Sequence, residues 1–173
     1  AYIFGIWLYS HKLKRIPFLG NLVSATLAIA PFFVVFVYYK NFETVIFAHA
    51  LFLFLIISMR ELTKDLENLK GDLALNYRTI PIVYGERTSK IMLSILIVLS
   101  LIPIYYLINH FKIGQMHYYF YLSAALLLFF IIFLWRSKER PHYLILHNIL
   151  KFIIVAGVFS IVLIDANVLL NRI

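Results

Sequence analysis

The segment from Arg60 to Asp72 carries most of the side chains in this chain whose types and spacing could do chemistry. If the helix before it continues, Glu61, Asp65, Asn68 and Asp72 stand at i, i+4, i+7 and i+11. They then share one face, because a helix advances by about 100° per residue. A row of oxygen ligands on one face can hold a hard cation such as Mg²⁺. The same pattern is also typical of a solvated loop between two membrane helices, and the spacing alone does not decide between the two.

The composition predicts a membrane protein. Of the 173 residues, 63% are hydrophobic and only 14% are charged, whereas soluble domains are usually about 45–50% apolar. The net charge of +8 therefore indicates basic loops beside anionic lipid, and we expect no nucleic-acid partner. The chain has no cysteine, which excludes disulfides and thiol chemistry.

Five apolar runs approach the length of about 20 residues that a membrane helix needs. They cover about 19–39, 42–59, 90–109, 116–135 and 142–170. Residues 1–10 are also apolar but too few to cross a bilayer, so we expect them to be the end of a crossing that starts upstream. The sequence thus predicts an all-α, polytopic transmembrane helix bundle, a single domain over residues 1–173 that is truncated at its N-terminus. It has about five full crossings plus the end of one.

The polar segment 60–87 contains Gly71, Pro81 and Gly85, which predicts a loop with helical pieces. Thr88 or Ser89 is the expected cap of the next helix. If successive loops alternate sides, thirteen of the sixteen Lys and Arg residues fall on one side of the membrane. This bias predicts that the segment is cytoplasmic. The protein is expected in a cell membrane, as in the inner membrane of a prokaryote.

Mixed acids and bases at a membrane surface suit a phosphorylated lipid. Mg²⁺ commonly bridges one or two carboxylates to substrate phosphates, and Lys and Arg side chains hold the remaining phosphate charge. A diphosphate bound in this way is a better leaving group, because the charge that develops on it is neutralised. The apolar tail of such a substrate would lie between the helices.

Two motifs in this order resemble the UbiA-type intramembrane prenyltransferases. They read Tyr9-Ser10-His11-Lys12-Leu13-Lys14-Arg15 with Gly20-Asn21, and Arg60-Glu61 through Asp72 followed by Arg78-Thr79-Ile80-Pro81 and Gly85. The pattern Arg-Glu-x-x-Lys-Asp-x-Glu is similar to the branch that includes archaeal digeranylgeranylglyceryl phosphate synthases. The resemblance implies a nine-helix bundle that uses Mg²⁺ and a polyprenyl diphosphate. It also implies prenyl transfer to a lipophilic acceptor, such as a quinone precursor or a glycerophosphate ether. The family's first Asp-rich motif has no counterpart in this sequence, so we expect this fragment alone to be inactive.

The resemblance also assigns site residues. Asp65 and Asp72 are the candidate catalytic residues, and Asp65, Asn68 and Asp72 the candidate metal ligands. The family's paired aspartates fall on Asn68 and Asp72, so one ligand would be an uncharged amide oxygen. The candidate diphosphate contacts are Arg60, Lys64, Arg78, Tyr9, Ser10 and Lys14.

His147 and Asn148 lie near the cytoplasmic end of the last apolar run. Polar side chains within a membrane tend to face a cavity or to bond between helices. They are therefore candidates for the acceptor side of the site, with interhelical hydrogen bonding as the alternative. A second function class also stays open, namely a bundle that binds or transports an anionic lipid without chemistry.

Overall fold

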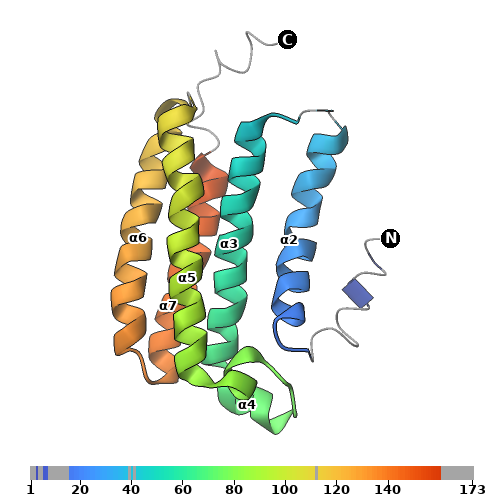
Figure 1. The fold of residues 1–173 in the computed structure, drawn as a ribbon, viewed down its shortest axis with the longest axis vertical. Helices are drawn as coiled ribbons and strands as arrows, with labels where there is room; N and C mark the ends of the chain where they lie inside the picture. The colour runs from blue at the N-terminus through green and yellow to red at the C-terminus, as the bar shows by residue number, and fades with distance from the viewer. Residues whose placement is uncertain are drawn as a thin grey trace.

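The computed structural model describes residues 16–38, 40, 42–111 and 113–160, together with 3, 6 and 7. Every element of secondary structure in these ranges is helical. In chain order they are α2 (Leu19–Tyr38), α3 (Thr44–Glu67), α4 (Leu69–Ala74), α5 (Ile80–His110), the 3₁₀ turn η2 (Gly114–Met116), α6 (His117–Arg136) and α7 (Arg140–Ser160). Figure 1 shows the five long helices side by side along one axis, with the short α4 across one end of the bundle.

The central helix is α3, which packs against α2, α5 and α7, while α6 closes the other side against α5 and α7. The core consists of apolar side chains from α3, α5, α6 and α7, among them Ile56, Leu93, Phe120, Phe130 and Leu146, all fully buried. Four helices are long and apolar enough to cross a membrane: α3, α5, α6 with η2, and α7. The shorter apolar stretch Leu19–Val34 belongs to α2. The predicted all-α membrane bundle is confirmed.

The helix boundaries near the polar segment differ from those expected. The helix α3 continues to Glu67, and α5 begins at Ile80, with Thr79 at its N-cap position and Pro81 in its first turn. The expectation that the next helix begins after a cap at Thr88 or Ser89 is therefore wrong. Proline suits the first helical turn because the missing N–H has no partner there, and this signal outweighs the later hydroxyl residues.

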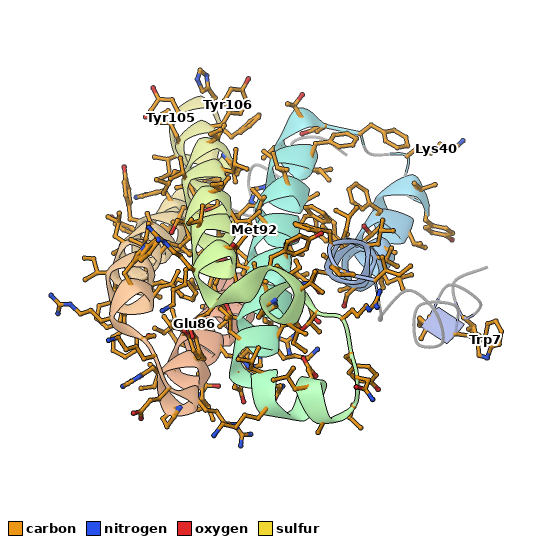
Figure 2. All side chains as sticks on the ribbon, turned by 60° about the horizontal axis from the view of Figure 1, so that its bottom comes forward. Trp7, Lys40, Glu86, Met92, Tyr105 and Tyr106 are labelled. Carbon is orange, nitrogen blue, oxygen red and sulfur yellow. The ribbon has the colours of Figure 1, made fainter. Side chains whose placement is uncertain are left out.

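One end of the bundle, which we call the polar end, holds most of the charged side chains in the described part of the chain. It comprises the start of α2, the end of α3, α4, the start of α5, the end of α6 and the start of α7 (Figure 1). Figure 2 shows Glu86 toward this end, and Lys40, Tyr105 and Tyr106 toward the other. Exposed tyrosines are typical of a membrane interface. The arrangement of helix ends agrees with the alternation of loops assumed in counting the bases.

Gly157 of α7 leaves room for the side chain of Tyr119 of α6. A Cβ atom at Gly157 would lie 2.7 Å from the Tyr119 hydroxyl oxygen. That hydroxyl donates a hydrogen bond to the Ile153 carbonyl at 3.0 Å, and the Tyr119 ring packs edge-on against Phe52 and Phe120. The ring is thus held on several sides and has little room to move.

We expect Gly157→Ala to lower the stability of the bundle by about 1–3 kcal/mol, the usual cost of overpacking a well-filled core. Thermal unfolding in detergent measures this. The control is Gly71→Ala, because a Cβ atom at Gly71 meets nothing within 4 Å. Equal unfolding temperatures for the two variants would contradict the tight contact.

Candidate functional site

A cavity of about 320 Å³ opens at the polar end, between the start of α2, the end of α3, α4 and the loop before α5. Its lining is rich in oxygen-bearing side chains. The polar lining residues are Asn21, Glu61, Lys64, Asp65, Asn68, Asp72, Tyr77 and Thr79. The predicted metal ligands Asp65, Asn68 and Asp72 therefore face one pocket, although they do not all belong to one helix.

The break between α3 and α4 preserves the direction of these side chains. Asn68 ends α3 and precedes α4 with φ −98° and ψ 15°, outside ideal helical values. Its N–H nevertheless donates to the Lys64 carbonyl at 3.0 Å, and its own carbonyl accepts from the Asp72 N–H at 2.9 Å. Helix-type bonds thus cross the junction, so the helical spacing of the acids survives the bend.

Glu61 is buried and holds two bases, of which Lys64 lines the pocket and Arg60 does not. Its carboxylate oxygens accept from Arg60 Nη1 and from Lys64 Nζ, each at 2.9 Å. The Glu61 side chain is only 9% exposed, against 31% for Arg60 and 38% for Lys64. The sequence placed Glu61 among the acids of one face. In the structure its charge is already matched by two bases, and its contact fixes the position of the Lys64 ammonium group.

Asn21 is a residue that the sequence analysis did not assign to the site. Its side chain interacts with the Asp65 carboxyl from the start of α2. Asn21 Nδ2 and Asp65 Oδ2 are both buried, and neither makes a hydrogen bond of good geometry within the described part of the chain, although the Asn21 amide is close enough to interact with the carboxyl. Buried polar atoms almost always have a partner, so an unmatched carboxylate oxygen facing a pocket fits a bound cation or water. The signal available in the sequence was its place in the Gly20-Asn21 pair of the first motif.

The side chains at the cavity could supply only some of the ligands that a metal ion needs. Within the described ranges, no group of three or more His, Asp or Glu side chains is close enough to hold a metal ion. Two carboxylates, Asp65 and Asp72, with amide oxygens from Asn68 and Asn21, nevertheless line the cavity. Mg²⁺ is usually held by one or two carboxylates, several waters and substrate phosphates. The residues present fit that mode and not an all-protein cage.

The other predicted site residues lie in different places. Arg78 is exposed and lies between the lining residues Tyr77 and Thr79, without itself lining the pocket. Tyr9, Ser10 and Lys14 lie outside the described residues.

His147 and Asn148 lie on different faces of α7. His147 is buried and pairs through Nδ1 with Glu67 Oε2 at 2.8 Å, so it bonds α7 to α3. Asn148 is exposed and lines a separate shallow groove between α6 and α7. Neither residue lines the polar cavity. His147 therefore makes a hydrogen bond between helices, which was the alternative to a place on the acceptor side of the site.

Gly85 permits the turn that brings one wall of the cavity into place. Its backbone has φ +84° and ψ 164°, and it divides α5 into a short first part and the long membrane helix. That conformation is essentially restricted to glycine. Thr79 and Tyr77, which precede Gly85, line the cavity. The Tyr84 ring packs at a tilt against Phe18, with ring centroids 5.1 Å apart.

We expect Gly85→Ala to cost about 1–3 kcal/mol of backbone strain and to loosen residues 75–84. The strain is purely conformational, because an added Cβ atom would meet nothing within 4 Å. Hydrogen exchange followed by mass spectrometry should show faster exchange over this segment. Unchanged exchange there would contradict a role for Gly85 in holding this wall.

These features define an all-helical membrane protein with an acid-lined polar pocket at one end of an apolar bundle. The chain belongs to the UbiA prenyltransferase family, whose family model matches residues 1–150. It is 34% identical over 117 residues to the digeranylgeranylglyceryl phosphate synthase of Methanobrevibacter smithii, covering 64% of this chain and 41% of the relative. It is 40% identical over 115 residues to the protein of the same name in Thermococcus sibiricus, covering 60% and 40%. The chain thus matches about two fifths of the length of these relatives. No solved structure matches it significantly.

Proposed function

We propose that this protein takes part in the Mg²⁺-dependent transfer of a polyprenyl group from a polyprenyl diphosphate to a lipophilic acceptor in the membrane. The observation that carries the proposal is the polar cavity, where Asp65, Asn68, Asp72 and Lys64 meet at the end of an apolar bundle. A substrate with a doubly phosphorylated head and a hydrocarbon tail matches both environments. Membership of the family supports the same reaction.

Asp65 and Asp72 are the proposed catalytic carboxylates and, with Asn68, the proposed Mg²⁺ ligands. Asp65 Oδ2 is buried and makes no hydrogen bond of good geometry among the described residues, which supports this assignment, and Asn21 is a further candidate through its amide oxygen. When bound, Mg²⁺ would neutralise charge on the departing diphosphate.

Lys64 is the proposed main cationic contact of the diphosphate, because Glu61 holds its ammonium group at the cavity. Arg60 shares the same carboxylate, and Arg78 adjoins two lining residues, so both are proposed as further contacts. Tyr9, Ser10 and Lys14 remain candidates on the resemblance of their motif alone.

The acceptor is proposed to be a glycerophosphate ether, because the relatives are named as synthases of digeranylgeranylglyceryl phosphate. A quinone precursor is the runner-up. We also propose that the polar end is cytoplasmic, since most of the chain's bases gather there. The proposed membrane is a prokaryotic cell membrane.

The test is prenyl transfer by the full-length protein in detergent or vesicles. The reaction contains Mg²⁺, a labelled polyprenyl diphosphate and a panel of acceptors that includes a glycerophosphate ether and a quinone precursor. We expect labelled product with one acceptor class and its loss when EDTA removes the metal. If the protein binds the diphosphate but forms no product with any acceptor, the alternative of a non-catalytic bundle that binds an anionic lipid is favoured.

A further inference from the structure

One face of α7 carries two polar residues that the proposed reaction does not use. Tyr143 and His147 are four residues apart, so they lie on the same side of the helix. Both are buried, at 3% and 7% exposure. Neither lines the polar cavity, yet each forms a hydrogen bond to an acidic residue on another helix.

His147 holds the end of α3. Its Nδ1 lies 2.8 Å from Glu67 Oε2, and both side chains are largely buried, at 9% and 12% exposure. Glu67 is the last residue of α3 and directly precedes Asn68. A hydrogen bond to a carboxylate in such a setting is stronger and more directional than one between neutral groups. The contact therefore fixes the point at which the site segment leaves α3.

Tyr143 holds the other end of the same segment. Its hydroxyl donates to Glu86 Oε1 at 2.6 Å, and Glu86 directly follows the bend at Gly85. The same carboxylate oxygen pairs with the buried Lys90 at 2.7 Å. The Lys90 ammonium group also donates to the Ser137 carbonyl in the turn before α7. The start of the long part of α5 is thus tied to α7 and to the turn that precedes it.

We propose that α7 is a positioning helix that fixes both ends of the site segment 68–85. Glu67 and Glu86 immediately flank this segment, and His147 and Tyr143 hold them from one helix face. The segment supplies Asn68, Asp72 and one wall of the cavity. The inference rests on the proposed function, because it assigns the two contacts to the geometry of the Mg²⁺ and diphosphate site. Groups that hydrogen-bond metal ligands directly commonly change metal affinity by about 10–100-fold when removed. His147 and Tyr143 act one residue further out, through Glu67 and Glu86, so we expect an effect at the lower end of that range.

The experiment measures Mg²⁺-dependent binding of inorganic diphosphate to the full-length protein in detergent. The readout is the Mg²⁺ concentration that gives half of the maximal thermal stabilisation by diphosphate. The variants are His147→Leu, which removes the contact to Glu67, and Tyr143→Phe, which removes only one hydroxyl. His147→Asn retains a donor near the position of Nδ1 and serves as the conservative variant.

The matched control is Tyr119→Phe. It also removes one buried tyrosine hydroxyl that bonds to α7, through the Ile153 carbonyl at 3.0 Å, but α7 there is nearer the end opposite the cavity. We expect His147→Leu and Tyr143→Phe each to raise the required Mg²⁺ about tenfold, and Tyr119→Phe to leave it unchanged. His147→Asn should return the requirement to within about threefold of the unsubstituted protein.

Two outcomes overturn the proposal in distinguishable ways. If Tyr143→Phe and His147→Leu only lower the unfolding temperature, as Tyr119→Phe does, and need no more Mg²⁺, then α7 merely stabilises the bundle and the proposed function stands. If the unsubstituted protein shows no stabilisation by Mg²⁺ and diphosphate together, the proposed function fails and the positioning role fails with it.

Discussion

Asp65→Ala and Asp72→Ala are each expected to lower kcat/KM for prenyl transfer by on the order of 10²–10³-fold, the range seen when one preorganised charge-stabilising group is removed. Both carboxylates line the cavity. Asp65 is buried. In Asp65→Ala, bulk water therefore has little access to the place that the carboxylate leaves, and it cannot easily serve as a replacement ligand. Each variant leaves the proposed metal with a single carboxylate, which weakens its hold on the diphosphate.

The measurement is steady-state prenyl transfer by the full-length protein over a range of Mg²⁺ concentrations. Glu139→Ala is the control, because it removes an exposed acid at the same end of the bundle outside the cavity. Asn68→Asp gives the opposite test, since it adds the charge that the family pattern has at this position. We expect it to lower the Mg²⁺ requirement. Full turnover by both alanine variants would remove Asp65 and Asp72 from the reaction.

Glu61→Ala is expected to raise the KM for the polyprenyl diphosphate about tenfold, with a smaller effect on kcat. Glu61 holds Arg60 and Lys64 at 2.9 Å each. Without it, the ammonium group of Lys64 loses the buried carboxylate that it contacts at 2.9 Å. The two bases are each about a third exposed, so water can solvate them and the loss of stability is expected to be modest.

Lys64→Ala is the companion variant for that prediction. If Glu61 acts through Lys64, the double variant Glu61→Ala with Lys64→Ala should be no worse than Lys64→Ala alone. Strictly multiplicative effects on KM would show that the two residues act independently. An increase in the affinity for diphosphate after Glu61→Ala would instead indicate that its negative charge repels the substrate.

Much of the architecture could be predicted from the sequence because membrane helices are defined by composition and length. Runs of about 20 apolar residues can satisfy their backbone only as helices in lipid, and α5, α6 and α7 lie where such runs occur. The boundaries were less predictable in the polar segment 60–87. There, helix capping and the turn at Gly85 compete with weak local signals, and the start of α5 was placed too late.

For the candidate site, too, the features that depend on nearby residues could be predicted and those that depend on packing could not. The acids of segment 60–72 could be grouped in advance because helical spacing is a local property, and hydrogen bonds across Asn68 preserve it. Asn21 and Tyr77 could not be placed at the cavity from the sequence analysis, because only packing brings the start of α2 and the loop before α5 to the end of α3. The partners of Glu61 are near in sequence, yet its burial, which gives those contacts weight, depends on neighbouring helices.

His147 shows most clearly what local pattern leaves open. The sequence by itself determined an apolar helical bundle with one acid-rich segment at a basic end, since periodicity and charge depend only on nearby residues. Whether His147 faces a ligand or another helix depends on a residue eighty positions earlier, Glu67. Only the tertiary structure decides such a pairing, because it arises from the way α7 packs on α3 and not from the residues around it.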